Sequence, residues 1–330
     1  MNAGRMTKWM GAALMCVAAA ATYTGAALAQ DQVNVRFSWK MKGEYGPLFL
    51  AQEKGAYAKE KLNVRMGEGA GAQAALGALL QGQEDIVILP AVFALTAIQK
   101  GMPVKLVAIY HPRTPIGIIS FPDKPVRVPK DLEGKTIAHS VGETGTSYLD
   151  AFCKLNSVDC GKISKVQMNS QSRMPQFLQR QVDLVTVYTN VDLPLIEAQT
   201  KQKYVLLDMP KYGFTIPGLA VVTSDAIIAA KPDVIKRYLR ATAQGIADTK
   251  ANNDEATRAM MKNWSGGPDA AIVAEQVKLT AAAIPVPAGH TIGWIDDKLI
   301  ADTLDLLKSA GEIDAPKPTS TYYTNALLGN

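Results

Sequence analysis

An aromatic and basic group of side chains follows the first segment of the chain that alternates like a strand, Val33–Trp39. Trp39, Lys40 and Tyr45 lie at its end and just beyond it. Indole and phenol rings stack on flat molecules, and a lysine ammonium group pairs with an anion. These residues predict one wall of a binding cleft, although Trp39 could be a core or hinge residue and Lys40 a solvated surface lysine.

A run of small polar residues, Gly142-Glu143-Thr144-Gly145-Thr146-Ser147, follows a second predicted strand, Thr136–His139. Ser147 and Asp150 have the spacing of a capping box, so we expect a helix, Ser147–Leu155, to begin at the end of this run. Free amides and hydroxyls at a helix start bind a carboxylate, a sulfonate or a phosphate, or any polar acceptor. The run predicts a second wall of the cleft, in which the glutamate is either a partner for an amine or a charge at the helix start.

The glycine-rich turn Gly67-Glu68-Gly69-Ala70-Gly71-Ala72 matches a permissive form of the dinucleotide-binding fingerprint. In that fingerprint an acidic residue about 20 positions further on ends the next strand. Here Glu84 and Asp85 precede that strand, so we interpret the glycines as a tight turn at the cleft edge. No cofactor is expected.

Motifs of catalysis are otherwise absent from the sequence. There is no His-Glu-x-x-His, no Gly-x-Ser-x-Gly and no cysteine paired with a plausible base. His111, His139 and His290 stand apart from other metal-ligand residues, so no metal site is predicted. The chain is expected to bind a molecule rather than to transform one.

Length and composition set the scale of the protein that holds these residues. A chain of 330 residues suggests about two domains, and 48% hydrophobic with 20% charged residues excludes disorder and collagen-like repeats. The net charge is only +5 and no run of Lys or Arg reaches four, so the pattern of a nucleic-acid binder is missing. We expect a soluble monomer with a small-molecule or protein partner.

The segment 1–29 has the pattern of a secretory signal. Arg5 and Lys8 precede the apolar run Trp9–Ala21, and Ala27-Leu28-Ala29 supplies the small residues of a cleavage site. A membrane anchor is the alternative, but the run has about 13 residues where spanning needs about 20. We expect cleavage after Ala29 and export of the remaining chain.

Export changes how the two remaining cysteines are interpreted, because Cys153 and Cys160 would then lie in an oxidising compartment. They flank the expected end of a helix and a turn. A short-range structural disulfide is predicted, with two free buried thiols as the alternative.

The elements that would position these side chains alternate between short β-branched runs and longer helical stretches. This pattern is typical of an α/β fold with mostly parallel sheets. The expected strands are Val33–Trp39, Asn63–Met66, Asp85–Leu89 and Val104–Tyr110, and the expected helices are Tyr45–Lys61, Gln73–Gln81, Ala91–Lys100 and Lys231–Ala251.

One supersecondary unit occurs twice. Val166-Gln167-Met168 resembles Val64-Arg65-Met66, and Leu178–Val185 resembles Leu80–Val87, in the same strand–helix–strand context. The duplication predicts two similar α/β lobes. Breaks rich in proline, glycine and aromatic residues, at 111–115 and 210–218, predict two hinge crossings between them. Lobe 1 would comprise residues 30–112 and 213–330, and lobe 2 residues 113–212.

The two copies also predict where the cleft lies. In open α/β sheets a ligand binds in the crevice outside the carboxyl ends of the strands. The residues that follow the paired strands are Pro90-Ala91 in the first copy and Tyr188-Thr189-Asn190 in the second. We expect both segments to line the cleft together with the two walls described above.

Motifs along nearly the whole chain beyond the leader carry a family resemblance. They are Trp39-Lys40-Met41-Lys42-Gly43-Glu44-Tyr45-Gly46-Pro47 with its continuation to Tyr57, Gly82–Ile86, Gly101–Lys105, Asp131–Ile137, Gln181–Asp183 and Gly311–Asn325. The chain resembles the solute-binding proteins of ABC importers, in the group that contains thiamine-pyrimidine-precursor, sulfonate, taurine and nitrate binders. The resemblance implies a two-lobe periplasmic binding protein clamp, type II-like, that closes on a small ligand and docks on the permease subunits.

The same resemblance bears on the ligand. The segment from Trp39 to Pro47 is similar to the pyrimidine-precursor branch, whose ligands are flat and heteroaromatic, and Trp39 and Tyr45 could sandwich such a ring. Lys40, Lys42 and Arg113 would instead suit a carboxylated or sulfonated ring. The segment Tyr188–Asp192 departs from the Trp- or Pro-rich signature of many relatives. A thiamine-pyrimidine-precursor-like ligand is favoured, and a flavin, an aromatic carboxylate and a sulfonate stay open.

Two other functions remain alternatives. A pyrimidine-synthase-like enzyme shares this fold, but it would need a cofactor-binding lysine and reactive histidine or cysteine residues in the cleft, and it would work in the cytoplasm. A sensor module that presents its ligand to a membrane receptor would use the same clamp.

Overall fold

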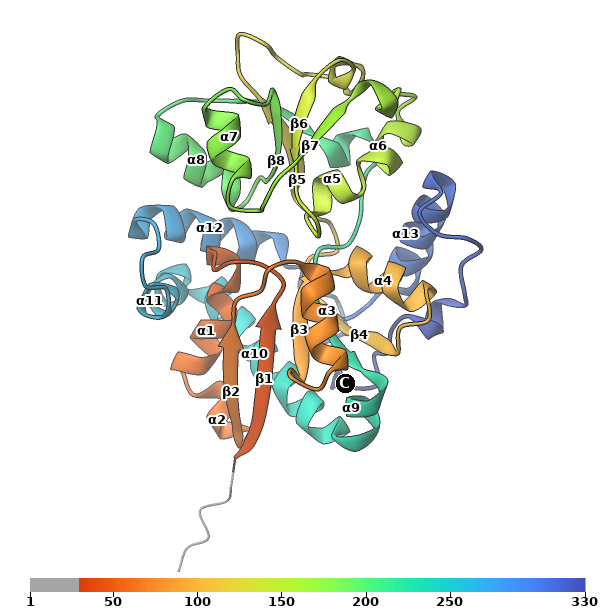
Figure 1. The fold of residues 1–330 in the computed structure, drawn as a ribbon. Coiled ribbons are helices and arrows are strands. Elements are labelled where there is room, and N and C mark those ends of the chain that lie inside the picture. Colours follow the sequence, from red (N-terminus) through yellow and green to blue (C-terminus); the bar gives the residue numbers. More distant parts are fainter. Residues whose placement is uncertain (1–29, 330) are drawn as a thin grey trace, which may run out of the picture.

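The computed structural model describes residues 30–329 and shows two lobes, each built around a five-stranded sheet (Figure 1). We call the lower lobe of Figure 1 lobe 1 and the upper lobe, coloured yellow to green, lobe 2. The predicted signal segment, 1–29, lies outside the described residues.

The sheet of lobe 1 consists of β1 (Asp31–Phe37), β2 (Leu62–Gly67), β3 (Ile86–Pro90), β4 (Val104–Ile109) and β10 (Leu219–Ser224). Its strand order is β2-β1-β3-β10-β4. β1 pairs in parallel with β2 and β3, whereas β10 runs antiparallel to both of its neighbours, β3 and β4. The sheet is therefore mostly parallel, with one reversed strand.

The sheet of lobe 2 repeats this arrangement with β5 (Ile116–Ser120), β6 (Thr136–His139), β7 (Ser164–Gln167), β8 (Leu184–Tyr188) and β9 (Val205–Asp208). Its order is β7-β6-β8-β5-β9, and β5 is the strand antiparallel to its neighbours. In each lobe the reversed strand is the one that directly follows a crossing, because β5 comes after the passage out of lobe 1 and β10 after the return. The predicted α/β fold with two similar lobes is confirmed.

Helices cover both sheets. Lobe 1 carries α1 (Gly46–Glu53), α2 (Ala56–Lys59), α3 (Ala72–Leu80), α4 (Ala91–Gln99), α9 (Asp225–Ala230), α10 (Pro232–Ala251), α11 (Asn253–Asn263), α12 (Ala270–Ala283) and α13 (Asp297–Ala310); lobe 2 carries α5 (Thr144–Ser147), α6 (Leu149–Leu155), α7 (Arg173–Leu178) and α8 (Asp192–Thr200). Within the described residues, every helix is too short or too polar to cross a membrane.

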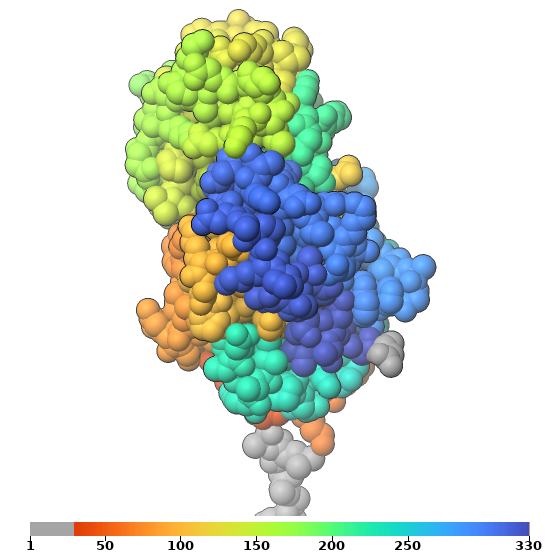
Figure 2. Space-filling model, turned by 90° about the vertical axis from the view of Figure 1, so that its right-hand side faces the viewer, coloured from red at the N-terminus to blue at the C-terminus, as the bar shows by residue number. Residues whose placement is uncertain are grey.

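The last part of the chain contacts both lobes. Figure 2 shows residues towards the C-terminus, in dark blue, spread over one side of lobe 1 and reaching lobe 2. There α13 packs against α6, and α12 packs against α8 on another part of the boundary. The two lobes are therefore joined by these helices as well as by the two crossings.

Two predicted helices differ from the structure. The expected helix Tyr45–Lys61 is divided into α1 and α2, because Gly55 between them has a left-handed backbone with φ of 71°. The expected start at Ser147 is wrong: α5 begins at Thr144, where the Glu143 side chain accepts hydrogen bonds from the amides of Gly145 and Thr146. A turn at Tyr148 then separates α5 from α6.

The predicted disulfide is present in the structure. Cys153, near the end of α6, is joined to Cys160, and their Cα atoms are 5.7 Å apart. The bond ties α6 to the short 3-10 turn Cys160–Lys162 that leads into β7.

Candidate functional site

A cleft lies where the two lobes meet, and both lobes contribute to its lining. Lobe 1 contributes the turn after β1, the end of β3 and the start of β10. Lobe 2 contributes the α5 turn, the start of α7, β8 and the start of α8. The lining residues are Ser38, Trp39, Lys42, Glu44, Tyr45, Leu89, Pro90, Leu219, Gly142, Glu143, Thr144, Arg173, Thr186, Tyr188 and Asp192.

A buried ion pair occupies the lobe 1 side of this cleft. Lys42 Nζ lies 2.7 Å from Glu44 Oε2, and the two side chains are only 13% and 4% exposed. Burial acts to lower the pKa of Lys42, but Glu44, Tyr188 and Asp192 outweigh it, so the pKa lies above its ordinary value. Lys42 is therefore held in its charged form.

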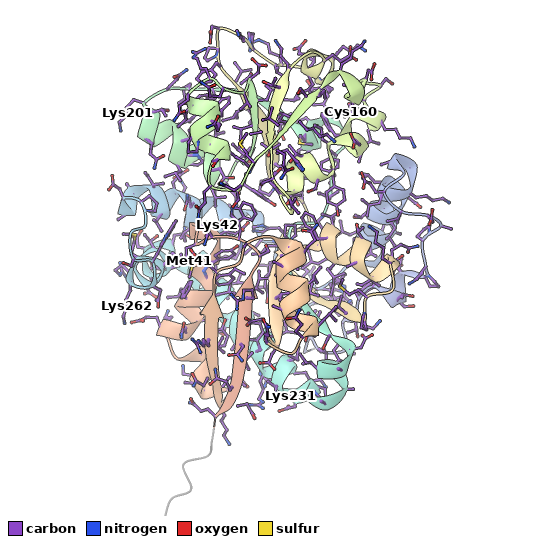
Figure 3. All side chains as sticks on the ribbon, in the orientation of Figure 1. Met41, Lys42, Cys160, Lys201, Lys231 and Lys262 are labelled. Carbon is purple, nitrogen blue, oxygen red and sulfur yellow. A yellow bond between two sulfur atoms is a disulfide. The ribbon has the colours of Figure 1, made fainter. Side chains whose placement is uncertain are left out.

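The ammonium group of Lys42 also reaches the other lobe. Its Nζ lies 4.6 Å from the centre of the Tyr188 ring in lobe 2 and 5.5 Å from the Tyr45 ring in lobe 1. An ammonium group at such distances is attracted by the negative face of a ring. Figure 3 labels Lys42 at the level where the lobes face each other. Lys42 is thus a direct electrostatic contact between the lobes.

The pKa values of Glu44 and Asp192 are shifted in opposite directions. Burial acts to raise the pKa of Glu44, but Lys42 and His111 outweigh it, and the pKa lies below its ordinary value. His111 Nδ1 is 3.5 Å from Glu44 Oε1, and burial lowers the pKa of this histidine. Asp192 accepts a hydrogen bond from the Tyr188 amide at 2.8 Å, yet burial raises its pKa. The pKa of Asp192 is thus raised by burial, whereas that of Glu44 is lowered by its charged neighbours.

The lobe 2 wall is a second buried network, centred on Glu143. Its carboxylate accepts hydrogen bonds from the amides of Gly145 at 2.7 Å and Thr146 at 2.9 Å, and from the Thr186 hydroxyl at 2.7 Å. Burial acts to raise the pKa of Glu143, but Arg173 and these hydrogen bonds outweigh it and lower the pKa. The amides that the sequence predicts for a ligand anion thus already have a carboxylate partner.

Arg173 faces the cleft from the start of α7. Its Nη2 donates to the Thr186 carbonyl at 3.1 Å and lies 3.7 Å from Glu143 Oε2. Its Nε is buried and has no hydrogen-bond partner among the described residues. A residue that lines the cleft thus keeps one unused hydrogen-bond donor.

The aromatic residues of the cleft have different surroundings. Tyr45 is 1% exposed and stacks on Phe37, with ring centres 3.8 Å apart and planes 5° apart. Tyr188 shares a hydrogen bond of 2.8 Å with the Thr144 hydroxyl. Trp39 is only partly buried and stacks on no other ring of the described chain. Trp39 is the ring best placed to stack on a ligand.

The structure brings together part of the set of residues predicted from the sequence. Trp39, Tyr45, Pro90, Gly142, Glu143, Thr144 and Tyr188 line the cleft. The other predicted residues do not line the cleft. Lys40 is exposed beside Glu68, Ala91 is buried in lobe 1, and Ser147 lines a separate groove. Gly145 and Thr146 pack behind Glu143, and the side chains of Thr189 and Asn190 form hydrogen bonds with other residues of the protein.

The glycine-rich turn before α3 packs beside Gly142, one of the residues that line the cleft. The amides of Gly69 and Gly71 donate to the carbonyls of Trp39 at 3.1 Å and Ser38 at 2.7 Å. A Cβ atom on Gly69 would lie 2.0 Å from the Phe37 carbonyl oxygen, so only glycine fits there. The turn therefore holds the segment that carries Trp39.

Sequence reasoning left several polar lining residues out of the site. The sequence indicates Lys42 only as a partner for an anion, and its motifs do not mark Glu44, Arg173, Thr186 or Asp192 as ligand-binding residues. Asp192 lies only two residues beyond Asn190, so extending the predicted segment by one turn would have found it. Arg173 carries no local signal, because its position follows from the packing of α7 against β8.

Comparison with known proteins adds further findings. A family model described as NMT1/THI5 like matches residues 42–256. The riboflavin-binding protein RibY of Chloroflexus aurantiacus is 26% identical over 311 residues, covering 90% of this chain and 86% of that protein. The 4-amino-5-hydroxymethyl-2-methylpyrimidine phosphate synthase of Schizosaccharomyces pombe is 24% identical over 225 residues, covering 65% of this chain and 64% of the synthase.

A solved structure shares the whole architecture. The alkanesulfonate-binding protein SsuA from Xanthomonas axonopodis pv. citri, bound to MOPS, aligns with a TM-score of 0.70 at 16% identity. The alignment covers 90% of this chain and 99% of that one. The fold is therefore that of the two-lobe periplasmic binding proteins.

Proposed function

Because the chain belongs to the NMT1/THI5-like family, we propose that it is the extracytoplasmic solute-binding component of an ABC importer. In this proposal, lobe 1 (residues 30–112 and 213–330) and lobe 2 (residues 113–212) close on one small molecule. The leader is removed after Ala29, and the monomer delivers its ligand from the periplasm to the permease subunits.

The observation that carries the proposal is the cleft itself, which is lined by both lobes and rich in buried polar groups. Small-molecule sites are concave, and a few polar groups within them fix the orientation of the ligand. Here these groups come from segments far apart in the sequence, such as the Lys42–Tyr45 turn and the start of α8. A molecule bound between them would contact both lobes at once and favour the closed arrangement.

The balance of charge in the cleft supports a flat ligand without a strong negative charge. Two bases, Lys42 and Arg173, face three acids, Glu44, Glu143 and Asp192, and the bases already have carboxylate neighbours. A sulfonate or carboxylate would approach these acids at a cost. A neutral heteroaromatic ring could stack on Trp39 and accept a hydrogen bond from Arg173. A thiamine-pyrimidine-precursor-like compound is favoured, and a flavin is second.

The relatives agree with such a ring and also raise an enzyme as the second candidate. One relative is named for binding riboflavin and another for making a pyrimidine phosphate. A lysine must be neutral to act as a nucleophile. Lys42 is instead paired with Glu44 and its pKa is raised, and Cys153 and Cys160 are joined in a disulfide. These features favour binding over catalysis.

A thermal-unfolding screen tests the proposal. Purified protein is heated with 4-amino-5-hydroxymethyl-2-methylpyrimidine, riboflavin, an aromatic carboxylate, an alkanesulfonate and, as the negative control, a nucleotide. We expect one flat ring compound to raise the melting temperature, because a ligand at a hundredfold excess over its Kd stabilises the folded state by about 2.7 kcal/mol. No shift with any compound, together with turnover of one of them, would overturn the proposal in favour of an enzyme.

The membrane protein that the ligand-bound form contacts distinguishes a transport function from a sensing function. Capture of the membrane protein that the ligand-bound form contacts should return permease subunits. Capture of a membrane receptor instead would assign the protein to signalling.

A further inference from the structure

A single buried glutamine on α12 connects the two sides of the cleft without lining it. Gln276 is 1% exposed. Its side-chain oxygen accepts a hydrogen bond of 2.8 Å from the Gly43 amide in lobe 1, and its side-chain nitrogen donates one of 2.8 Å to the Val191 carbonyl in lobe 2. One amide group thus bonds to the backbone of both lobes.

The two bonded residues adjoin the charged groups of the cleft. Gly43 lies between Lys42 and Glu44, the buried ion pair, and Val191 directly precedes Asp192. A hydrogen bond to the backbone at Gly43 and at Val191 fixes the position of the backbone from which the neighbouring side chains extend. The distance between the Lys42 ammonium group and the Tyr188 ring therefore depends on α12.

A second contact on the same face of α12 supports this role. Thr280 follows Gln276 by one helical turn, is fully buried, and accepts a hydrogen bond of 3.2 Å from the Asn190 side chain of lobe 2. On the lobe 1 side the packing is close: a Cβ atom on Gly43 would lie 2.5 Å from Gln276 Cβ, and one on Gly46 would lie 2.9 Å from Val277 Cγ2. The Lys42–Gly46 turn and α12 are therefore fitted to each other.

We propose that Gln276 is a positioning residue that, with Thr280, holds the two lobes in the relative position that forms the cleft. The amide side chain can accept from one lobe and donate to the other, which neither a carboxylate nor an apolar side chain of the same size can do. The inference rests on the proposed function only in that a closed cleft is what a ligand would bind.

The test measures the separation of the lobes without any ligand, so it does not depend on the proposed function. Spin labels are attached at Lys203→Cys in lobe 2 and Lys262→Cys in lobe 1. Pulsed electron–electron double resonance then gives the distribution of distances between the two labels. Figure 3 names Lys262 in lobe 1 and Lys201 in lobe 2, on the same side of the molecule. Lys201 lies two residues before Lys203, the position of the spin label in lobe 2. Cys153 and Cys160 are paired and do not take the label, and the labelled protein is produced without residues 1–29, which contain the third cysteine, Cys16.

Two variants and one matched control carry the comparison. Gln276→Met removes both hydrogen bonds while keeping the volume, and Thr280→Val removes only the bond to Asn190. Thr249→Val is the control, because this threonine is equally buried but its hydroxyl donates only within α10, to the Gly245 carbonyl at 2.7 Å.

We expect Gln276→Met to lengthen and broaden the distance distribution, Thr280→Val to do so less, and Thr249→Val to leave it as in the parent. If Gln276→Met does not fold, Thr280→Val decides the matter. Parent-like distributions in the folded Gln276 and Thr280 variants would overturn the inference, as would an equal change in the Thr249 control.

Discussion

Replacing Lys42 by methionine should destabilise the protein far more than the same change at Lys40, two residues earlier. Lys42 and Glu44 form a buried pair, with side chains 13% and 4% exposed, whereas Lys40 and Glu68 form an exposed pair, 51% and 37% exposed. Removing one partner of a buried pair costs about 3–5 kcal/mol, because the other charge remains without compensation. An exposed pair contributes about 0–1 kcal/mol.

The expected change in melting temperature follows from these free energies. For a chain of this size about 2 °C corresponds to each kcal/mol, so Lys42→Met should lower the melting temperature by about 6–10 °C. Lys40→Met should lower it by about 2 °C or less. Thermal unfolding followed by circular dichroism, with both variants in the same buffer, measures the two changes.

The loss should also depend on pH, and its sign can be worked out. In the parent the pKa of Glu44 is lowered, so its contribution to stability is present above the unfolded pKa of about 4.3 and is lost only at lower pH. In Lys42→Met burial acts on Glu44 without its main partner and raises the pKa above the unfolded value. The variant then loses stability as the pH rises, and the difference from the parent should be smaller at pH 5 than at pH 8.

The double variant Lys42→Met/Glu44→Gln is the internal check. With both charges removed, no unpaired carboxylate is buried, and most of the lost stability should return. A loss of stability in Lys42→Met no larger than in Lys40→Met, or an equal loss at pH 5 and pH 8, would show that Lys42 and Glu44 do not form a stabilising buried pair.

Three further outcomes are expected from the cleft and the disulfide. Trp39→Ala should weaken ligand binding by the stacking contribution, about 1 kcal/mol beyond lost area, in calorimetric titration, whereas Trp294→Ala, away from the cleft, should bind like the parent. Glu143→Gln should lower the melting temperature, since it removes the charge that faces Arg173 and caps α5, at a cost of about 1–3 kcal/mol. An unchanged melting temperature would contradict a stabilising role of the Glu143 network. Cys153→Ser should cost at most about 2–3 kcal/mol because the closed loop is short, and thiol titration of denatured, unreduced parent protein should find no free Cys153 or Cys160.

The strands and the duplicated architecture were predictable from local patterns. Val33–Trp39 and Val104–Tyr110 alternate or are β-branched, and the structure places β1 and β4 within one or two residues of them. The similar segments Leu80–Val87 and Leu178–Val185 lead into β3 and β8, which occupy the same place in their sheets. Such features are carried by neighbouring residues in the sequence, so no tertiary information was needed.

The polar chemistry of the site was not predictable in the same way. Lys42 and Glu44 look like solvated charges in the sequence, but they are buried in the structure, where Lys42 contacts Tyr188 of lobe 2 and the adjoining Gly43 bonds to α12. Glutamate is not a preferred helix cap, so the Ser147–Asp150 spacing was the better local signal although Glu143 caps the helix. Gln276 contacts Gly43 across 233 positions, a relation that no local pattern carries.

Mass spectrometry of small molecules released by denaturation from freshly purified protein shows whether the cleft between the lobes binds one flat ring compound. The parent should release one heteroaromatic compound in nearly equimolar amount, and Trp39→Ala, purified in parallel, should release much less of it. Release of a sulfonate or another simple anion, or equal retention of the ring compound by Trp39→Ala, would contradict binding of a flat ring compound in the cleft.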